Sequence, residues 1–217
     1  MNNPKFIASI FKKFNRFINN LLEKNLNKLN IDNFKNLLIN NKIFLSIVAL
    51  IILFLSYLSF PNIYNKEEVA LEIKKNLKNK LNLEFNFQED LNYKFLPRPH
   101  FTTNNSSINF KEDKITEIKK LKFYISLENL FSLKNLKLNH VILEDANFNL
   151  NKNNSNFFYN LLDANLNDFK FEILNSNVFY RSIENEVLFI NNISNAKYYF
   201  DYKEIKNMLY SNNEIFN

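Results

Sequence analysis

The 217-residue chain contains no cysteine, no glycine and no tryptophan, and only two histidines, His100 and His140. Without cysteine there is no disulfide framework and no thiolate chemistry. Without glycine, the usual phosphate-cradling loops are excluded. Turns that need a positive φ must then use Asn or Asp, the next most tolerant residues. Together these absences exclude most metal and nucleophile sites before any motif is considered.

The net charge of +6 is confined to one end of the chain. Residues 1–42 carry eight Lys or Arg and two acidic residues, whereas residues 43–217 carry twenty of each sign. This is the positive-inside asymmetry, and it predicts a cytoplasmic N-terminus. A nucleic-acid partner would require a basic patch on the folded part. We therefore expect no nucleic-acid partner.

Residues 43–60, IFLSIVALIILFLSYLSF, contain no charge. As a helix they would reach roughly 27 Å, close to the hydrocarbon thickness of a bilayer. They are apolar on all faces and longer than the core of a cleaved signal peptide, so they predict a single transmembrane helix. Residues 1–42 predict a basic amphipathic helix on the membrane surface, or alternatively one packed on a partner protein. Residues 61–217 form the domain beyond the membrane.

Residues 66–81 predict a short helix with Val69, Ile73, Leu77 and Leu81 on one face. After it, apolar and polar residues alternate over short runs separated by Asn and Asp, which predicts a meandering antiparallel sheet. A brief helix is expected around residues 127–133. The predicted fold is α+β and membrane-anchored.

A sheet with one apolar face and few helices to cover it needs lipid, a partner or a second layer. The apolar strand positions are therefore candidates for contact with lipid in a groove. A closed β-sandwich remains the alternative. The candidate lipid-facing residues are Leu83, Phe85, Phe87, Tyr93, Phe95, Leu136, Leu138 and Phe148.

The segment Leu96-Pro97-Arg98-Pro99-His100 contains two prolines two residues apart, which excludes a central strand and predicts an edge, bend or turn. His100 has no partner His or Cys nearby and is interpreted as a solvated loop residue. His140 lies in a strand and is interpreted as a structural histidine.

In this order of parts the chain resembles the N-terminal region of AsmA-like proteins of Gram-negative bacteria. The resemblance covers about residues 43–210. Its most specific elements are FLPRPHF at residues 95–101 and the LFSLKNLKL block within residues 115–150; the strand pair at residues 171–193 follows the same pattern. It implies an inner-membrane anchor, a periplasmic β-rich domain and a role in envelope lipid homeostasis. The family is similar to bridge-like lipid transfer proteins, whose sheet curls into an apolar groove.

The leading hypothesis is therefore a non-enzymatic protein that moves phospholipid toward the outer membrane. The alternative is a β-sandwich scaffold or adaptor for outer-membrane protein assembly. The partners expected are phospholipid, the membrane and an envelope protein; no cofactor is expected. Family members are usually several hundred residues long, and residues 214–216 resemble the start of a further strand. We thus expect the chain to be an N-terminal fragment.

Overall fold

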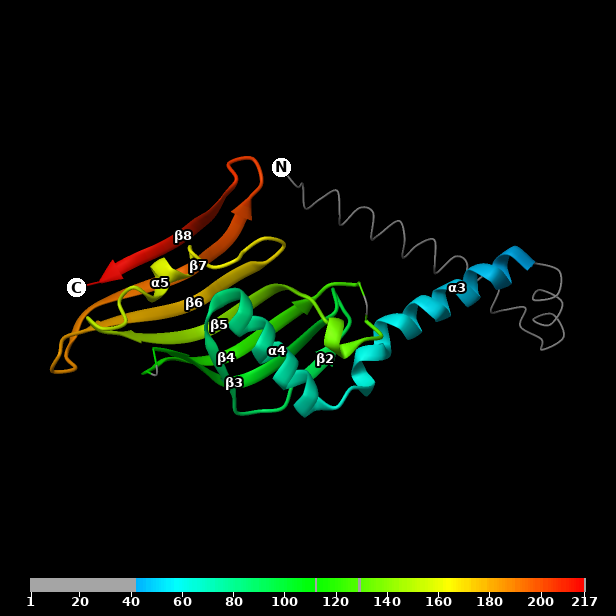
Figure 1. Cartoon of the computed structure of the whole chain (residues 1–217), viewed down its shortest axis with the longest axis horizontal. Helices are drawn as coiled ribbons and strands as arrows, with labels where there is room; N and C mark the ends of the chain where they lie inside the picture. The colour runs from blue at the N-terminus through cyan, green and yellow to red at the C-terminus, as the bar shows by residue number, and fades with distance from the viewer. Residues whose placement is uncertain (1–41, 112, 129, 217) are drawn as a thin grey trace, which may run out of the picture. The chain divides into compact units, whose positions relative to one another are not determined.

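The computed structural model describes residues 42–111, 113–128 and 130–216. Of the described residues, those from Leu55 onward belong to one compact unit. The amphipathic helix expected in residues 1–42 lies outside the described residues. Figure 1 shows the elements in chain order.

Helix α3 (Lys42–Ser59) confirms the helix predicted at residues 43–60. Together with the short 3-10 helix η1 (Phe60–Ile63) it forms a stretch of 19 residues, Leu45–Ile63, that is long and apolar enough to cross a membrane. Pro61 stands at the start of η1, where its missing N–H breaks no helical hydrogen bond. One apolar helix near the N-terminus thus indicates membrane anchoring.

Helix α4 (Lys66–Leu81) has the bounds that the sequence predicted. The side chain of Asn65 caps its first turn by accepting from the backbone N–H of Glu67 at 2.8 Å and of Glu68 at 3.3 Å. At the other end Asn82 takes a left-handed conformation with φ 55°, the role that glycine has in most chains. Asparagine therefore defines both ends of the helix.

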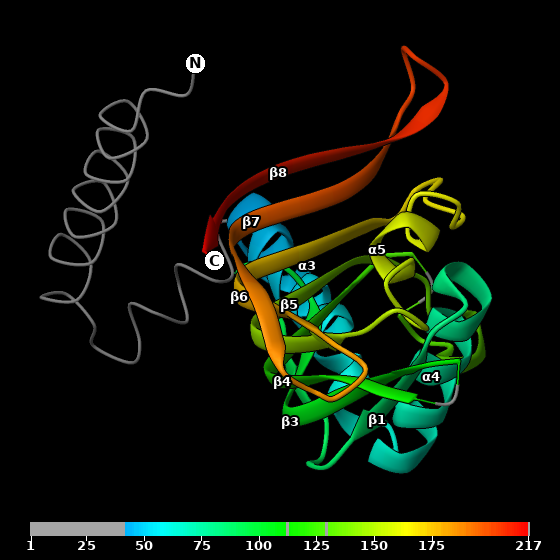
Figure 2. The same cartoon turned by 90° about the vertical axis from the view of Figure 1, so that its left-hand side faces the viewer.

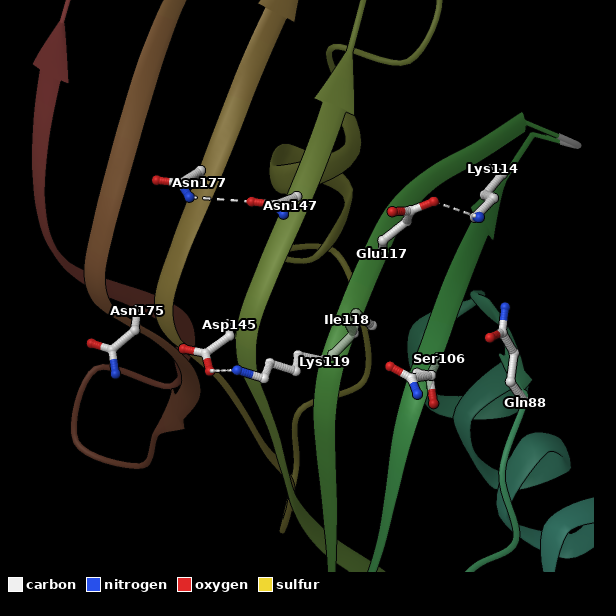
Figure 3. Close-up of a pocket in the computed structure, with 11 residues that line it drawn as sticks. Gln88, Ser106, Lys114, Glu117, Ile118, Lys119, Asp145, Asn147, Asn175 and Asn177 are labelled. Carbon is white, nitrogen blue, oxygen red and sulfur yellow. Dashed lines mark hydrogen bonds and ion pairs between the residues drawn. The ribbon is translucent and has the colours of Figure 1, made fainter.

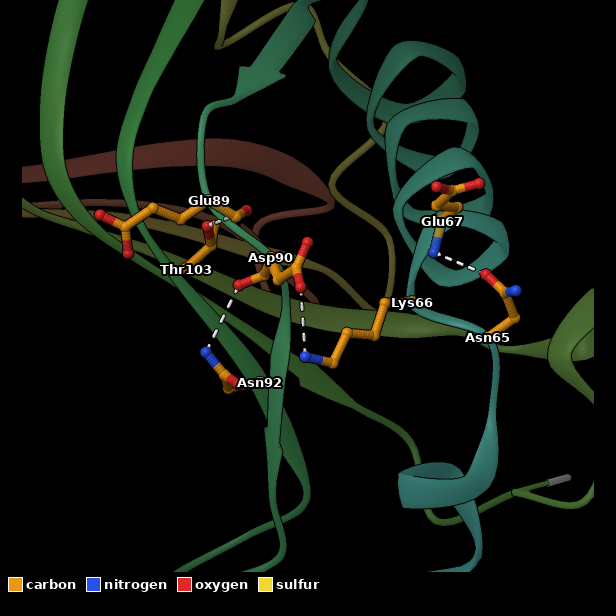
Figure 4. A network of polar contacts seen from close by, with 7 residues as sticks. All are labelled: Asn65, Lys66, Glu67, Glu89, Asp90, Asn92 and Thr103. Carbon is orange, nitrogen blue, oxygen red and sulfur yellow. Dashed lines mark hydrogen bonds and ion pairs between the residues drawn. The ribbon is translucent and has the colours of Figure 1, made fainter.

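The first turn of α4 is also tied to the segment that links the first two strands (Figure 4). The Lys66 ammonium lies 3.2 Å from the carboxylate of Asp90. The hydroxyl of Thr103 donates to the carbonyl of Glu89 at 2.8 Å. These contacts hold the start of α4 beside the sheet.

The remaining described residues form one eight-stranded sheet. Its order is β1-β3-β4-β5-β6-β7-β8, and β2 pairs with β3 beside β1. The strands are β1 (Glu84–Phe87), β2 (Asn92–Lys94), β3 (His100–Phe110), β4 (Asp113–Ile125), β5 (Leu138–Leu150), β6 (Lys170–Arg181), β7 (Val187–Asp201) and β8 (Lys206–Phe216). The helix expected around residues 127–133 is replaced by turns and the 3-10 helix η2 (Leu133–Asn135). Glu214–Phe216, which suggested the start of a further strand, lie at the end of β8.

All neighbouring strands are antiparallel except β5 and β6, which are parallel. The predicted meander is therefore interrupted once, and the sheet is mixed. Parallel neighbours need a long crossover, and residues 151–169 supply it. This crossover contains the short helix α5 (Phe157–Asn160). The ring of Phe157 packs 5.6 Å from Phe110 and 5.7 Å from Phe148, so the crossover returns over the apolar face of the sheet.

Helix α4 and the crossover lie on the same side of the sheet (Figure 2). Val69, Ile73, Leu77 and Leu81 are buried on α4, and they belong to one hydrophobic core with Phe157 and the facing strand residues. The fold is thus a single sheet with helices on one face, in agreement with the α+β prediction. The two sheets of a sandwich are not found among the described residues.

Positive φ angles occur at eight residues of the described chain, and six of these are Asn or Asp, as the lack of glycine predicted. The exceptions are Lys111 and Ile205. Ile205 has φ 53° in the turn between β7 and β8, and its side chain is 78% exposed. A β-branched residue is strained in this region because Cβ approaches the following carbonyl.

Replacing Ile205 with glycine should therefore raise the free energy of unfolding by about 1 kcal/mol, because it removes this strain and little packing. The matched control is Ile183→Gly: Ile183 is also highly exposed, at 90%, in the turn between β6 and β7, but has no positive φ. Thermal unfolding of the full chain in lipid nanodiscs, followed by circular dichroism, measures both. A gain for Ile183→Gly equal to that for Ile205→Gly would contradict the explanation.

Candidate functional site

Five strands of the sheet are distorted at the same level. The regular pairing between neighbouring strands skips one residue on each of them: Asn105 on β3, Lys119 on β4, Asp145 on β5, Asn175 on β6 and Ser194 on β7. We call these residues the kink line. Asn105, Asp145 and Asn175 are left-handed, with φ of 49°, 54° and 47°. Each strand therefore gains one residue that interrupts its regular alternation.

The kink line reverses which residues face the core. On β5, Val141 and Leu143 are buried before the line, and Ala146 and Phe148 after it. The buried positions thus step by three at the line instead of by two, and β3 and β6 show the same step. This step is visible in the sequence, and simple alternation missed it.

A hollow of about 540 Å³ lies over the kink line on the face away from α4. Its lining is polar: Lys119 approaches Asp145 at 3.9 Å, and Lys114 contacts Glu117 at 2.8 Å (Figure 3). The amides of Asn147 and Asn177 are joined at 3.2 Å across the parallel strands. This face of the sheet presents amides and paired charges, so it is not an apolar lipid surface.

The apolar face begins under α4, and this is where most of the predicted lipid-facing residues lie. Leu83, Phe85, Leu136, Leu138 and Phe148 are fully buried in the core. Phe87 and Tyr93 are half-buried against it, and Phe95 is exposed in the loop after β2. The structure therefore brings seven of the eight together in one core. Their contact with lipid stays a prediction.

The same apolar face continues across β6 and β7 onto β8. The crossover that covers it ends at β8. The crossover reaches β8 at Asn207, whose amide donates to the carbonyls of Leu162 at 2.5 Å and Ala164 at 2.8 Å. Beyond this contact, Leu209 is paired with the buried Tyr198 but is itself 42% exposed. Ile215 is 66% exposed, opposite Asn191.

Two aromatic rings extend this uncovered part. Tyr180 on β6 and Phe189 on β7 are paired in register and stack at 4.2 Å between ring centroids, and both are half-buried. We call Tyr180, Phe189, Leu209 and Ile215 the open rows. The alternation of apolar and polar residues does not reveal the open rows, because they depend on strand order and on how far the cover extends.

The Pro97-Arg98-Pro99 segment leads into β3 at one end of the sheet, as predicted for a bend. The Leu96–Pro97 peptide bond is cis, and the carbonyl of Pro99 accepts from the N–H of Ile125 at 3.1 Å. The interpretation of His100 as a solvated loop residue was wrong. His100 is the first residue of β3, only 5% exposed, and stacks on Tyr124 at 5.0 Å. Tertiary packing buries it, which no local sequence signal indicates.

His140 is a buried structural histidine, as predicted. Its Nε2 lies 3.0 Å from the carboxylate of Glu172, whose other oxygen is 3.2 Å from Lys197. Its ring stacks on Tyr124 at 5.3 Å, so Tyr124 lies between the two histidines. Burial lowers the pKa of His140 from 6.5 to about 4, although the charge of Glu172 opposes this shift. The native state therefore holds His140 neutral.

A second charged cluster lies beside it on the polar face. Glu144 contacts Lys120 at 3.2 Å and also accepts a hydrogen bond from Lys122. Burial alone would raise the pKa of Glu144, but the two lysines outweigh it and lower that pKa below 4.5. These groups form ion pairs between strands. In the part of the chain that the structure describes, no three His, Asp or Glu side chains are grouped to hold a metal ion.

The depressed pKa of His140 predicts a loss of stability in acid. Unfolding releases the imidazole to its ordinary pKa, so the unfolded chain binds a proton between pH 6.5 and 4 that the native state does not. Stability should therefore be complete above pH 6.5 and fall as the pH drops toward 4. Urea unfolding of His140→Gln should lack this part of the pH dependence. An unchanged pH profile in that variant would contradict the assignment.

Comparison with known proteins connects this architecture to a family. A comparison with curated proteins found no match. The model of the AsmA family matches residues 39–191, which include α3, α4 and the sheet as far as the first part of β7. The matched region thus contains the apolar helix, the Pro97–Pro99 bend and both parallel strands. The chain belongs to the AsmA family.

Proposed function

We propose that this chain is a membrane-anchored envelope protein that carries phospholipid along the apolar face of its sheet toward the outer membrane, without enzymatic chemistry. Membership of the AsmA family fits envelope lipid or assembly roles in general. The observation that carries the lipid proposal is the continuation of the apolar face past its cover. The face is closed from β1 as far as β7, where Val178 and Tyr198 are still buried, and is open only at the open rows, Tyr180, Phe189, Leu209 and Ile215.

The orientation belongs to the same proposal. The excess positive charge of residues 1–42 favours a cytoplasmic N-terminus, which puts the sheet in the periplasm and α3 in the inner membrane. Acyl chains would then meet apolar side chains of the open rows on a sheet held at the membrane. Because dispersion and area burial are not directional, such a surface binds acyl chains without choosing one of them. This is the property that a carrier of bulk phospholipid needs.

The predicted lipid-facing residues that are buried do not contact lipid in the resting structure under this proposal. Leu83, Phe85 and Phe148 form the closed end of the apolar face, and lipid would reach them only if α4 moved away. Each fully buried residue of this size stabilises the fold by about 1.5–3 kcal/mol, so displacing the helix would cost many such contributions. We therefore assign lipid contact in the resting structure to the open rows.

A role as an adaptor in outer-membrane protein assembly is the second candidate, and the edge strand favours it. Within the described residues β8 pairs only with β7, so the outer backbone groups of Lys206–Phe216 have no strand partner there. A partner strand could extend the sheet at this edge.

Photocrosslinking tests the lipid proposal. Leu209 and Tyr210 are neighbours on β8 with similar exposure, but Leu209 shares a face with Tyr198, whereas Tyr210 pairs with Lys197 on the polar face. A benzophenone amino acid placed at 209 should capture phospholipid in cells, because it lies in the open rows. The same group at 210 is the matched control. Equal capture at both positions, or capture at 210 alone, would contradict the proposal.

A further inference from the structure

The outer end of the apolar span is joined to the loop between β4 and β5. The hydroxyl of Tyr57 donates to the carbonyl of Leu127 and accepts from the N–H of Leu130 at 3.3 Å. The hydroxyl of Tyr64 donates to the carbonyl of Leu130 at 2.5 Å. The ring of Phe131 lies between those of Tyr57 and Phe60, at 4.8 Å and 4.6 Å.

These contacts fix the depth of the loop. Tyr57 lies six residues before Ile63, the end of the apolar stretch. With a rise of about 1.5 Å per residue in α3 and about 2.0 Å in the 3-10 helix η1, it is about 10 Å below that end. An amphipathic surface element is buried about 5–10 Å into the boundary between headgroups and acyl chains. Leu127 and Phe131, which contact the Tyr57 side chain, must therefore lie within this layer if the stretch crosses a bilayer.

The side chains at this end of the sheet are suited to that layer. Phe131 is 60% exposed although it is aromatic, and Leu96 and Ile63 are more exposed still. Leu96 belongs to the bend that contacts the end of β4 through Pro99 and Ile125. The exposed cations Lys94 and Arg98 flank the same bend and match lipid phosphate. We call Ile63, Leu96, Leu127 and Phe131 the collar.

Backbone groups of the loop between β4 and β5 are hydrogen-bonded in a way that suits a region with little water. Unpaired N–H and C=O groups cost several kcal/mol in lipid. The tyrosine hydroxyls of the anchor segment satisfy the carbonyl of Leu127 and both backbone groups of Leu130. On an ordinary solvated loop, water would serve these groups equally well.

We propose that the collar inserts into the headgroup layer of the bilayer, so that the end of the sheet rests on the membrane through a second contact beside α3. The collar makes the anchor rigid, because the sheet is held by the span and by the surrounding lipid together. It also holds this end of the sheet at the level of the headgroups. This inference rests on the membrane anchoring included in the proposed function, and not on lipid capture by the open rows.

Single tryptophans test the collar directly, because the chain has none. The variants are Phe131→Trp in the collar, Leu50→Trp within α3 and Ile183→Trp in the exposed turn between β6 and β7. Each full chain is reconstituted into phosphatidylcholine–phosphatidylglycerol vesicles that contain lipids brominated either near the carbonyl or near the end of the acyl chain.

The Phe131→Trp protein should emit in the blue and lose roughly half of its fluorescence to the shallow bromines, as expected for a ring at the interface. Leu50→Trp should be quenched best by the deep bromines, and Ile183→Trp by neither. Leu96→Trp is a second collar position and should behave like Phe131→Trp. If both collar variants were as unquenched as Ile183→Trp while Leu50→Trp was quenched, the collar would be refuted and the anchor would stand. An unquenched Leu50→Trp would refute the anchor and the collar together.

Discussion

Burial of one face of the sheet against α4 and the crossover is the interaction on which the other features depend. Val69, Ile73 and Leu77 of α4 are buried in one core with the sheet, and Phe157 of the crossover packs on Phe148 of β5. A single sheet with an apolar face is unstable in water unless that face is covered. The two covers end before β8, so they leave the open rows uncovered although most of β6 and β7 is buried. The stability of the closed part and the proposed function of the open part thus come from the same arrangement.

The absence of glycine determines which residues form the kinks of this sheet. The kink line needs an extra residue in five adjacent strands, and on three of them that residue is left-handed. Asn105, Asp145 and Asn175 adopt this conformation at low cost because their short polar side chains can bond locally. The kinks also turn the amides and paired charges to the face away from α4. Asparagine, which is abundant in this chain, therefore takes the left-handed positions that glycine usually occupies.

Sequence patterns predicted the elements that depend on local periodicity. The bounds of α4 follow from the spacing of its apolar residues, and α3 follows from length and apolarity. The parallel pairing of β5 and β6 could not be predicted in this way, because alternation is the same for both directions. The long segment between Leu150 and Lys170 was the available signal, since a hairpin would need only a few residues.

The candidate site was harder to predict than the fold. Alternation correctly placed Phe85 and Phe148 on the apolar face, but burial under α4 depends on which helix lies over which strands. The open rows depend on where the crossover ends, at Asn207, which is a property of the assembled structure. His100 was misjudged for the same reason: the ring of Tyr124 that covers it comes from β4, and only the strand register brings the two together.

The central claim is that an apolar face, closed at one end and open at the other, holds phospholipid. Native mass spectrometry of the full chain, extracted gently with its membrane lipids, tests it most directly. The account predicts bound phospholipid on the intact protein and its loss in Leu209→Asp, with retention in Tyr210→Asp, because only Leu209 lies on the apolar face. Protein without phospholipid, or equal retention in both variants, would contradict the account.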